Sequence, residues 1–130
     1  MKTIKESGRG HKQKDRKSIF IGTAYKISSK EEARSALEKV RQEFPKATHN
    51  AFAYRIGVPV EWEECSDDGE VKGCAGKPLI TILQKKELTN ILIIVTRFYG
   101  GVKLGPGRLL RNYSQCAAKL LELIETEAIM

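Results

Sequence analysis

The sequence has no long apolar run and no signal peptide. Its longest uninterrupted apolar stretch, residues 91–95, is about a quarter of the roughly 20 residues that a membrane-spanning helix needs. The basic N-terminus is not followed by the apolar segment that a signal peptide requires. We therefore expect a cytoplasmic protein with no membrane contact.

Cysteines are also scarce, and their spacing predicts neither a disulfide framework nor a structural metal site. The three are Cys65, Cys74 and Cys116, and no two have the short spacing of a zinc-binding pair. A mixed site that combines two of them with His49 and Asp67 is a weaker alternative. We predict reduced, structural thiols and expect neither a metal nor a cofactor.

Length and composition describe one folded domain with an excess of positive charge. The chain has 130 residues, of which 41% are hydrophobic and 30% charged, so it can fill a single core and is not a disordered chain. The net charge of +7 and the isoelectric point near 9.4 point to a polyanionic partner such as RNA or the ribosome.

Residues 1–17 carry much of this charge. Lysines and arginines there greatly outnumber Glu6 and Asp15, and apolar residues are almost absent. This composition predicts a flexible basic arm, which is either a solubilising tail or an electrostatic contact to nucleic acid. The folded domain is then expected to span residues 18–130.

The rest of the chain alternates strand and helix patterns. Ser29 and Glu32 form a capping box at the start of an amphipathic helix that ends before Pro45. Pro78 is tolerated only in a first helical turn, so the second helix should begin near Lys77. The other expected elements are a strand over 18–27, a strand over 48–57, an optional short strand over 58–62, a polar loop over 63–73, an apolar strand over 89–98 and a last helix after Gly105-Pro106-Gly107. This order predicts an α+β fold in which helices cover one face of a single sheet.

An acidic loop, defined here as residues 61–70, holds six carboxylates and no basic residue. Like charges this close repel one another, so the loop needs a basic partner, a cation or water. Alternatively, Ser66 or Asp67 accepts backbone hydrogen bonds in a turn completed by Gly69. The adjacent Asp67 and Asp68 lack the alternating spacing of an EF-hand calcium loop.

A basic loop, defined here as residues 97–111, holds four basic residues, four glycines and no acid. Glycines before a helix let backbone amides approach a ligand, and the helix N-terminus favours an anion such as phosphate. Phe98 and Tyr99 offer aromatic faces on which bases of single-stranded RNA can stack. A tight turn with solvent-facing arginines is the alternative. The loop has neither P-loop nor dinucleotide-binding spacing.

Several gapped motifs within residues 18–122 resemble the Impact family of uncharacterised and translation-regulatory proteins. The motifs are Ser66-Asp67-Asp68-Gly69-Glu70, Ala75-Gly76-Lys77-Pro78, Val95-Thr96-Arg97-Phe98-Tyr99-Gly100-Gly101-Val102-Lys103-Leu104-Gly105 and Arg111-Asn112-Tyr113-Ser114, with His49, Ala53 and Tyr54 in the strand before them. The resemblance implies a fold like the fourth domain of elongation factor G, of the ribosomal protein S5 domain 2-like type, with a left-handed crossover.

The resemblance also implies a role in translational control. Eukaryotic relatives carry an RWD domain before this one, bind the activator of the amino-acid-starvation kinase and restrain phosphorylation of initiation factor two. Bacterial relatives add a ferredoxin-like domain. We expect a stand-alone Impact domain, which is a non-enzymatic, translation-associated regulatory or binding protein of the stress response. The sequence departs from the family pattern at Val71, Lys72 and Cys74, and at Pro106-Gly107-Arg108.

Three hypotheses assign work to the two loops. In the first, cations of the basic loop contact phosphates of RNA or the ribosome. In the second, Asp67 and Asp68 bind a translational-control protein. In the third, an enzyme acts on a phosphorylated small molecule, held by Arg97 and Lys103, with Asp67 or Asp68 as the acid/base or metal carboxylate. No nucleophile with an adjacent base supports the third hypothesis.

The opposite charges of the loops also predict a structural clasp. In it, Asp67 or Asp68 pairs with Arg97 or Lys103, and other cations of the basic loop remain free for a partner. The candidate binding residues are Asp67, Asp68, Glu70, Lys77, Arg97, Tyr99, Lys103, Arg108 and Arg111. Arg108 and Arg111 are the two that the clasp would leave free.

Overall fold

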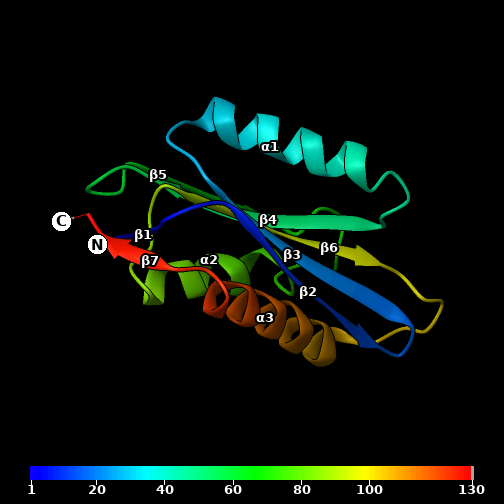
Figure 1. The fold of residues 1–130 in the computed structure, drawn as a ribbon. Coiled ribbons are helices and arrows are strands. Elements are labelled where there is room, and N and C mark those ends of the chain that lie inside the picture. The colour runs from blue at the N-terminus through cyan, green and yellow to red at the C-terminus, as the bar shows by residue number, and fades with distance from the viewer. Residues whose placement is uncertain (130) are drawn as a thin grey trace.

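The computed structural model describes residues 1–129, and the fold is α+β (Figure 1). The elements of this part of the chain are β1 (Lys2–Ile4), β2 (Gly8–Asp15), β3 (Ser18–Lys26), α1 (Lys30–Glu43), β4 (His49–Ile56), β5 (Trp62–Ser66), α2 (Gly76–Lys85), β6 (Ile91–Phe98), α3 (Pro106–Glu122) and β7 (Thr126–Ala128). The predicted fold class is therefore confirmed.

The main sheet has five strands in the order β2-β3-β6-β4-β5, and each neighbouring pair is antiparallel. Because β3 and β4 both run antiparallel to β6, they are parallel to each other. Helix α1 forms the crossover that such a parallel pair requires. A second, two-stranded sheet joins β1 to β7 and brings the two ends of the described chain together.

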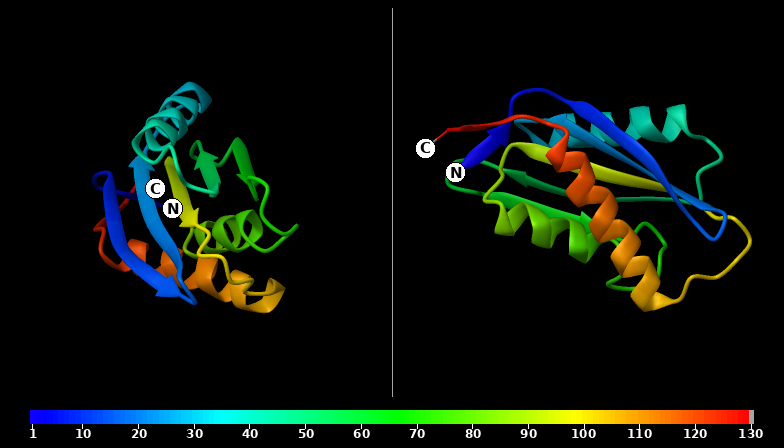
Figure 2. Two further views of the ribbon diagram at one scale, coloured as in Figure 1. Left: turned by 90° about the vertical axis from the view of Figure 1, so that its right-hand side faces the viewer. Right: turned by 60° about the horizontal axis from the view of Figure 1, so that its bottom comes forward.

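Helices cover both faces of the main sheet. Along β6, Ile91, Ile93 and Val95 pack in the cluster that includes α2 and α3, whereas Leu92 and Ile94 pack against α1. Figure 2 shows α1 on one side of the sheet and the other two helices on the opposite side. The expectation that one face is covered was wrong, because an apolar stripe shows that a helix packs on a sheet but not on which face.

The first helix begins as its capping box predicts. Ser29 Oγ accepts a hydrogen bond from the Glu32 amide at 3.1 Å, and the Glu32 carboxylate accepts from the Ser28 amide at 2.6 Å. Each bond satisfies an amide that the helix itself leaves free. Ala36 and Val40, which face the sheet, are buried.

Residues 1–17 are part of the fold rather than a flexible arm. Strand β2 pairs with β3 along its length, and Gln13 Nε2 donates to Asn112 Oδ1 of α3 at 2.9 Å. A Cβ at Gly10 would lie 3.3 Å from Leu120, so the strand runs close against α3. Composition pointed to disorder because an edge strand exposes much of its surface and needs few apolar residues.

The acidic loop is partly a strand. Residues 62–66 form β5, which pairs with β4 from Phe52↔Ser66 to Ile56↔Trp62. The short strand therefore begins at Trp62 instead of spanning 58–62, and the polar loop is correspondingly shorter than 63–73. Glutamates hide this strand in the sequence because its side chains are largely exposed at the sheet edge.

No helix within residues 1–129 combines the length and the apolarity that crossing a bilayer demands.

Candidate functional site

A tight turn after β5 directs Glu70 into the protein. The Glu70 amide donates to the Asp67 carbonyl at 2.9 Å, and the two central residues, Asp68 and Gly69, have φ values of 46° and 83°. Glycine adopts such a conformation without cost, whereas aspartate is one of the few other residues that tolerates it. The turn reverses the chain, and the Glu70 side chain becomes 4% exposed.

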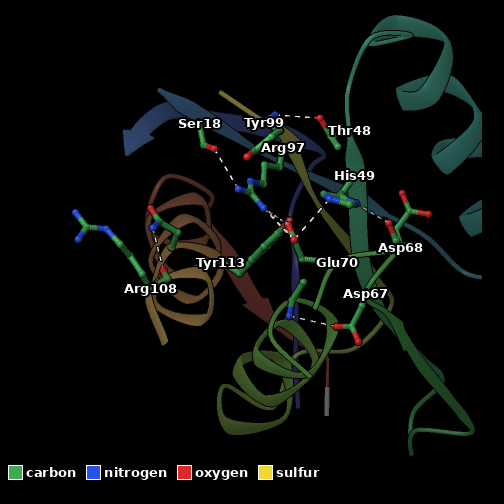
Figure 3. A network of polar contacts seen from close by, with 12 residues as sticks. Ser18, Thr48, His49, Asp67, Asp68, Glu70, Arg97, Tyr99, Arg108 and Tyr113 are labelled. Carbon is green, nitrogen blue, oxygen red and sulfur yellow. Dashed lines mark hydrogen bonds and ion pairs between the residues drawn. The ribbon is translucent and has the colours of Figure 1, made fainter. Parts of the chain in front are cut away.

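Arg97, near the end of β6, meets Glu70 beneath the two loops (Figure 3). Its Nη1 donates to Glu70 Oε2 at 2.7 Å and to Oε1 at 2.9 Å, and its Nη2 donates to Ser18 Oγ at 3.2 Å. The guanidinium carbon also lies 5.6 Å from the Phe20 ring centroid and 5.5 Å from that of Tyr99. A buried pair of this kind is retained only when further hydrogen bonds and packing satisfy its charges.

Tyr113 of α3 completes this buried cluster from below. Its hydroxyl donates to Glu70 Oε2 at 2.6 Å, and its ring packs edge-on against Phe20 with centroids 5.4 Å apart. Burial, and then the bond to the Glu70 carboxylate, raises the pKa of Tyr113 well above its ordinary value. The phenol is therefore a fixed donor that ties α3 to the acidic loop.

His49 stands at the start of β4 beside the same carboxylate. Its Nδ1 lies 2.9 Å from the Asp68 carbonyl oxygen, which can only accept, so Nδ1 carries a proton and donates. The other ring nitrogen, Nε2, lies 3.6 Å from Glu70 Oε1. In the neutral ring this nitrogen is a hydrogen-bond acceptor.

Asp67 has a structural role. Its carboxylate accepts hydrogen bonds from the amides of Gly73, Ala75 and Gly76 at 2.8–3.2 Å, where α2 begins without a cap from its own N-cap residue. Burial alone would raise the pKa of Asp67, but these three bonds outweigh it and hold the pKa below the ordinary value. One of the two alternatives for this loop, a turn with backbone hydrogen bonds, is therefore observed.

Asp68 is also engaged within the fold. Its Oδ2 accepts from the Asn50 amide at 2.6 Å and its Oδ1 from Arg41 Nη2 at 3.3 Å. The clasp was predicted with Asp67 or Asp68 as the acid, and this choice was wrong: Glu70 supplies the carboxylate to Arg97. Sequence spacing could not identify it, because the direction of each side chain depends on the positive-φ turn.

A pocket of about 490 Å³ opens above this cluster, and we call it the central pocket. His49, Glu70 and Arg97 line its polar part. Its other lining residues are mainly apolar or from the basic loop: Thr48, Val71, Tyr99, Lys103, Leu104, Gly105, Pro106 and Leu109. A concave, largely apolar pocket with a few convergent polar groups is the usual form of a ligand site.

The other predicted cations occupy three different places. Lys103 is exposed and lines the central pocket. Lys77 is in the first turn of α2 and lines a separate cavity between α2 and α3, so it is not part of the central pocket. Arg108, expected to be free, donates to Asp15 at 2.7 and 2.9 Å. This bond, and then one from Asn112, lowers the pKa of Asp15 to about 2.

A groove of about 390 Å³ between β2 and α3 gathers basic side chains. Lys14, Arg108, Arg111 and Lys119 line it against a single acid, Asp15. The neighbouring β2–β3 turn adds Arg16 and Lys17, and Gly100 of the basic loop lies directly against the Lys17 backbone, where a Cβ would be 2.2 Å away. We call Lys14, Arg16, Lys17, Arg108, Arg111 and Lys119 the basic end.

Several of these contributors were not predicted from the sequence. Lys14, Arg16 and Lys17 were assigned to a flexible arm, and Tyr113 was assigned only to the apolar stripe of the last helix. A buried tyrosine hydroxyl needs a partner, so its place on that stripe was the available signal. Among residues 1–129, no three His, Cys, Asp or Glu side chains are grouped to hold a metal ion.

The architecture is one already seen in solved structures. A protein solved as "an hypothetical protein" superposes with a TM-score of 0.91 at 30% identity, over 97% of this chain and 62% of that one. The two-domain translational regulator Yih1 superposes with a TM-score of 0.60 at 24% identity, over 93% of this chain and 48% of that one. Both likenesses define the class of fold, an α+β domain that also occurs joined to a second domain.

Sequence comparison then gives the family. The profile of the Impact N-terminal domain matches residues 16–121, and the chain belongs to the Impact family. It is 38% identical over 122 residues to IMPACT family member YvyE of Bacillus subtilis and 40% identical over 114 residues to an IMPACT family member of Haemophilus influenzae. These matches cover 94% and 86% of this chain but only 56% and 55% of the relatives, so the chain spans about half their length.

Proposed function

We propose that this chain is a non-enzymatic, translation-associated binding protein that contacts RNA or the ribosome through its basic end. The observation that carries the proposal is the convergence of cations from the β2–β3 hairpin and α3 around one groove. Asp15 neutralises Arg108, whereas no interaction is found for Lys14 or Arg111 among the described residues. Phosphates are the natural counter-charge for such a surface.

Family membership supports a role in translation. A solved structure of the same fold carries the name of a translational regulator, and that title speaks for that protein alone. The first-listed hypothesis is also favoured by the state of the acids. Asp67 and Asp68 are occupied by backbone amides and by Arg41, so they offer a protein partner or a substrate little free charge.

A salt titration of RNA binding tests this proposal. Fluorescence anisotropy with a short labelled single-stranded RNA should give an association constant that falls as salt rises. The slope of its logarithm should be roughly 0.7 per phosphate contacted. Arg111→Gln with Lys119→Gln should lower both affinity and slope, by about one unit of slope in total.

The matched control removes two lysines from another surface. Lys85 and Lys86 are exposed at the C-terminal end of α2, away from the groove, so Lys85→Gln with Lys86→Gln changes the net charge equally. Equal losses in the two double variants would mean that only overall charge matters. Absence of salt-dependent binding by the unmodified chain would reject RNA contact.

A further inference from the structure

The central pocket presents hydrogen-bond acceptors at its polar end. His49 Nε2 and Glu70 Oε1 lie 3.6 Å apart, and both residues line the pocket. Since Nδ1 donates to the Asp68 carbonyl, the neutral His49 ring offers the Nε2 lone pair. Glu70 Oε1 accepts only from Arg97 Nη1 among the bonds found, so it retains accepting capacity.

Arg97 cannot act as the matching donor to a ligand. Its Nη1 is held by Glu70 and its Nη2 by Ser18, and its Nε is fully buried without a partner. The cluster therefore shows acceptors to the pocket while the guanidinium faces inward. A ligand group that carries N–H hydrogens fits this end, and a carbonyl oxygen placed there would face a carboxylate.

The walls suit a flat, mostly apolar ring. Leu104 and Leu109 are buried, while Val71 and Tyr99 are 48% and 46% exposed at the opening. Tyr99 presents an aromatic face of the kind on which unstacked bases rest. A cavity of about 490 Å³ is large enough for one base and leaves room at its mouth.

Groups for the adjoining phosphate stand at the opening. Lys103 is exposed there, and Gly105 and Pro106 belong to the start of α3, a helix with no side-chain cap and no acid in its first turn. The amides of that turn and the lysine favour the same charge. The basic loop thus runs from the central pocket directly to the basic end, through Arg108.

We infer that the central pocket accommodates one unstacked base of a single-stranded RNA bound at the basic end, and that it prefers bases carrying an exocyclic amino group. The inference rests on the proposed function and assigns it a specificity. Adenine, cytosine and guanine each offer an amino group to His49 and Glu70. Uracil places carbonyl oxygens on both sides of its single imino hydrogen, so it pairs poorly with two acceptors.

Oligocytidylate and oligouridylate of equal length provide a direct test, because the two bases differ mainly in the amino or oxo group at one ring carbon. In a slightly alkaline buffer of fixed salt, oligocytidylate should bind roughly three- to tenfold more tightly, as expected for one hydrogen bond. An oligomer of equal charge with abasic sugars should bind more weakly than either. Equal affinities for all three would overturn the inference and leave the electrostatic contact intact.

Pocket variants give a second readout. Val71→Trp should close the opening without disturbing the core, because Val71 is exposed, and should abolish the preference for cytosine. Leu123→Trp, at an exposed position that does not line the pocket, is the control and should keep it. A preference that survives Val71→Trp would place base recognition elsewhere. Loss of binding to every oligomer, abasic included, in the unmodified chain would reject the proposed function itself.

Discussion

At the scale of single residues, the buried Glu70–Arg97 pair determines how tightly the two loops are joined. Both side chains are almost inaccessible, and Tyr113 and Ser18 satisfy part of their remaining hydrogen-bonding capacity. A buried charge is costly when its partner is removed, whereas replacing both charges by apolar groups is often tolerated. The single and the double substitution should therefore differ in an unusual direction.

Glu70→Ala should lower the free energy of unfolding by roughly 3–5 kcal/mol, because Arg97 is left buried without a counter-charge. Glu70→Leu combined with Arg97→Met should cost less than Glu70→Ala alone. Urea denaturation followed by circular dichroism measures both. If the double variant were the less stable one, the pair would be a net source of stability, contrary to this account.

Asp67 gives the fold a dependence on acid pH. Its pKa in the folded state lies below the ordinary value, so its contribution to stability is complete above about pH 4 and is lost as the pH falls through the lowered pKa. Asp67→Asn should cost about 1 kcal/mol near neutral pH, as for the loss of a helix cap. Thermal denaturation across the acid range should show the two proteins converging, and a constant difference at every pH would refute this role.

The sequence was informative about residue types and less so about directions. It singled out Asp67, Glu70, Arg97 and Lys103, and three of these residues line or adjoin one pocket. It could not tell which of six acids meets Arg97, because that depends on Asp68 and Gly69 both adopting positive φ. Local backbone geometry of this kind is not encoded in charge spacing.

At the scale of elements, the β2–β3 hairpin turn combines strain with charge. Arg16 and Lys17 form its two-residue loop between paired Asp15 and Ser18, with φ values of 44° and 71°. Such turns favour Asn-Gly, because positive φ is unfavourable for most side chains. Two long cations at these positions indicate that the turn is not selected for stability alone.

Arg16→Asn with Lys17→Gly should raise the free energy of unfolding by about 1–2 kcal/mol while weakening RNA binding. Both effects follow from the same change, since the new residues fit the turn and carry no charge. Arg16→Gln with Lys17→Gln is the control: it should weaken binding equally without the gain in stability. Thermal denaturation and anisotropy measured on the same samples would expose any variant in which the two effects do not separate.

Element order was largely predictable, and the exceptions share a cause. Helices α1, α2 and α3 were expected from their caps, prolines and apolar stripes, and they begin at or near the predicted residues. Strands β2 and β5 were missed or misplaced because both are sheet edges. An edge strand pairs on one side only and exposes polar side chains, so its sequence lacks the apolar alternation by which strands are recognised.

At the scale of the whole molecule, the basic N-terminal segment is needed for folding as well as for charge. Deleting residues 1–17 would remove β2 from β3 and break the contacts of Asp15 and Gln13 with α3. The truncated chain should melt at a much lower temperature or lose its cooperative transition. A flexible arm could be removed without such a loss, and an unchanged melting temperature would favour that older picture.

A full-length control separates folding from charge. Lys12, Lys14, Arg16 and Lys17 are exposed, and their combined replacement by glutamine leaves the backbone of β2 in place. This variant should melt near the temperature of the unmodified chain yet bind RNA more weakly. The fold class and the family were accessible from the sequence, whereas the dependence of the sheet on this segment became visible only in its pairing.

The ribbon of β1 and β7 has a mechanical consequence. It holds the two ends of the described chain side by side, from Lys2↔Ala128 to Ile4↔Thr126, at the opposite end of the molecule from the β2–β3 turn (Figure 1). A force that draws the ends apart would load these pairs one after another, like a zipper, rather than all together. The ribbon should therefore peel open at low force in an optical trap, while the five-stranded sheet and its central pocket remain folded.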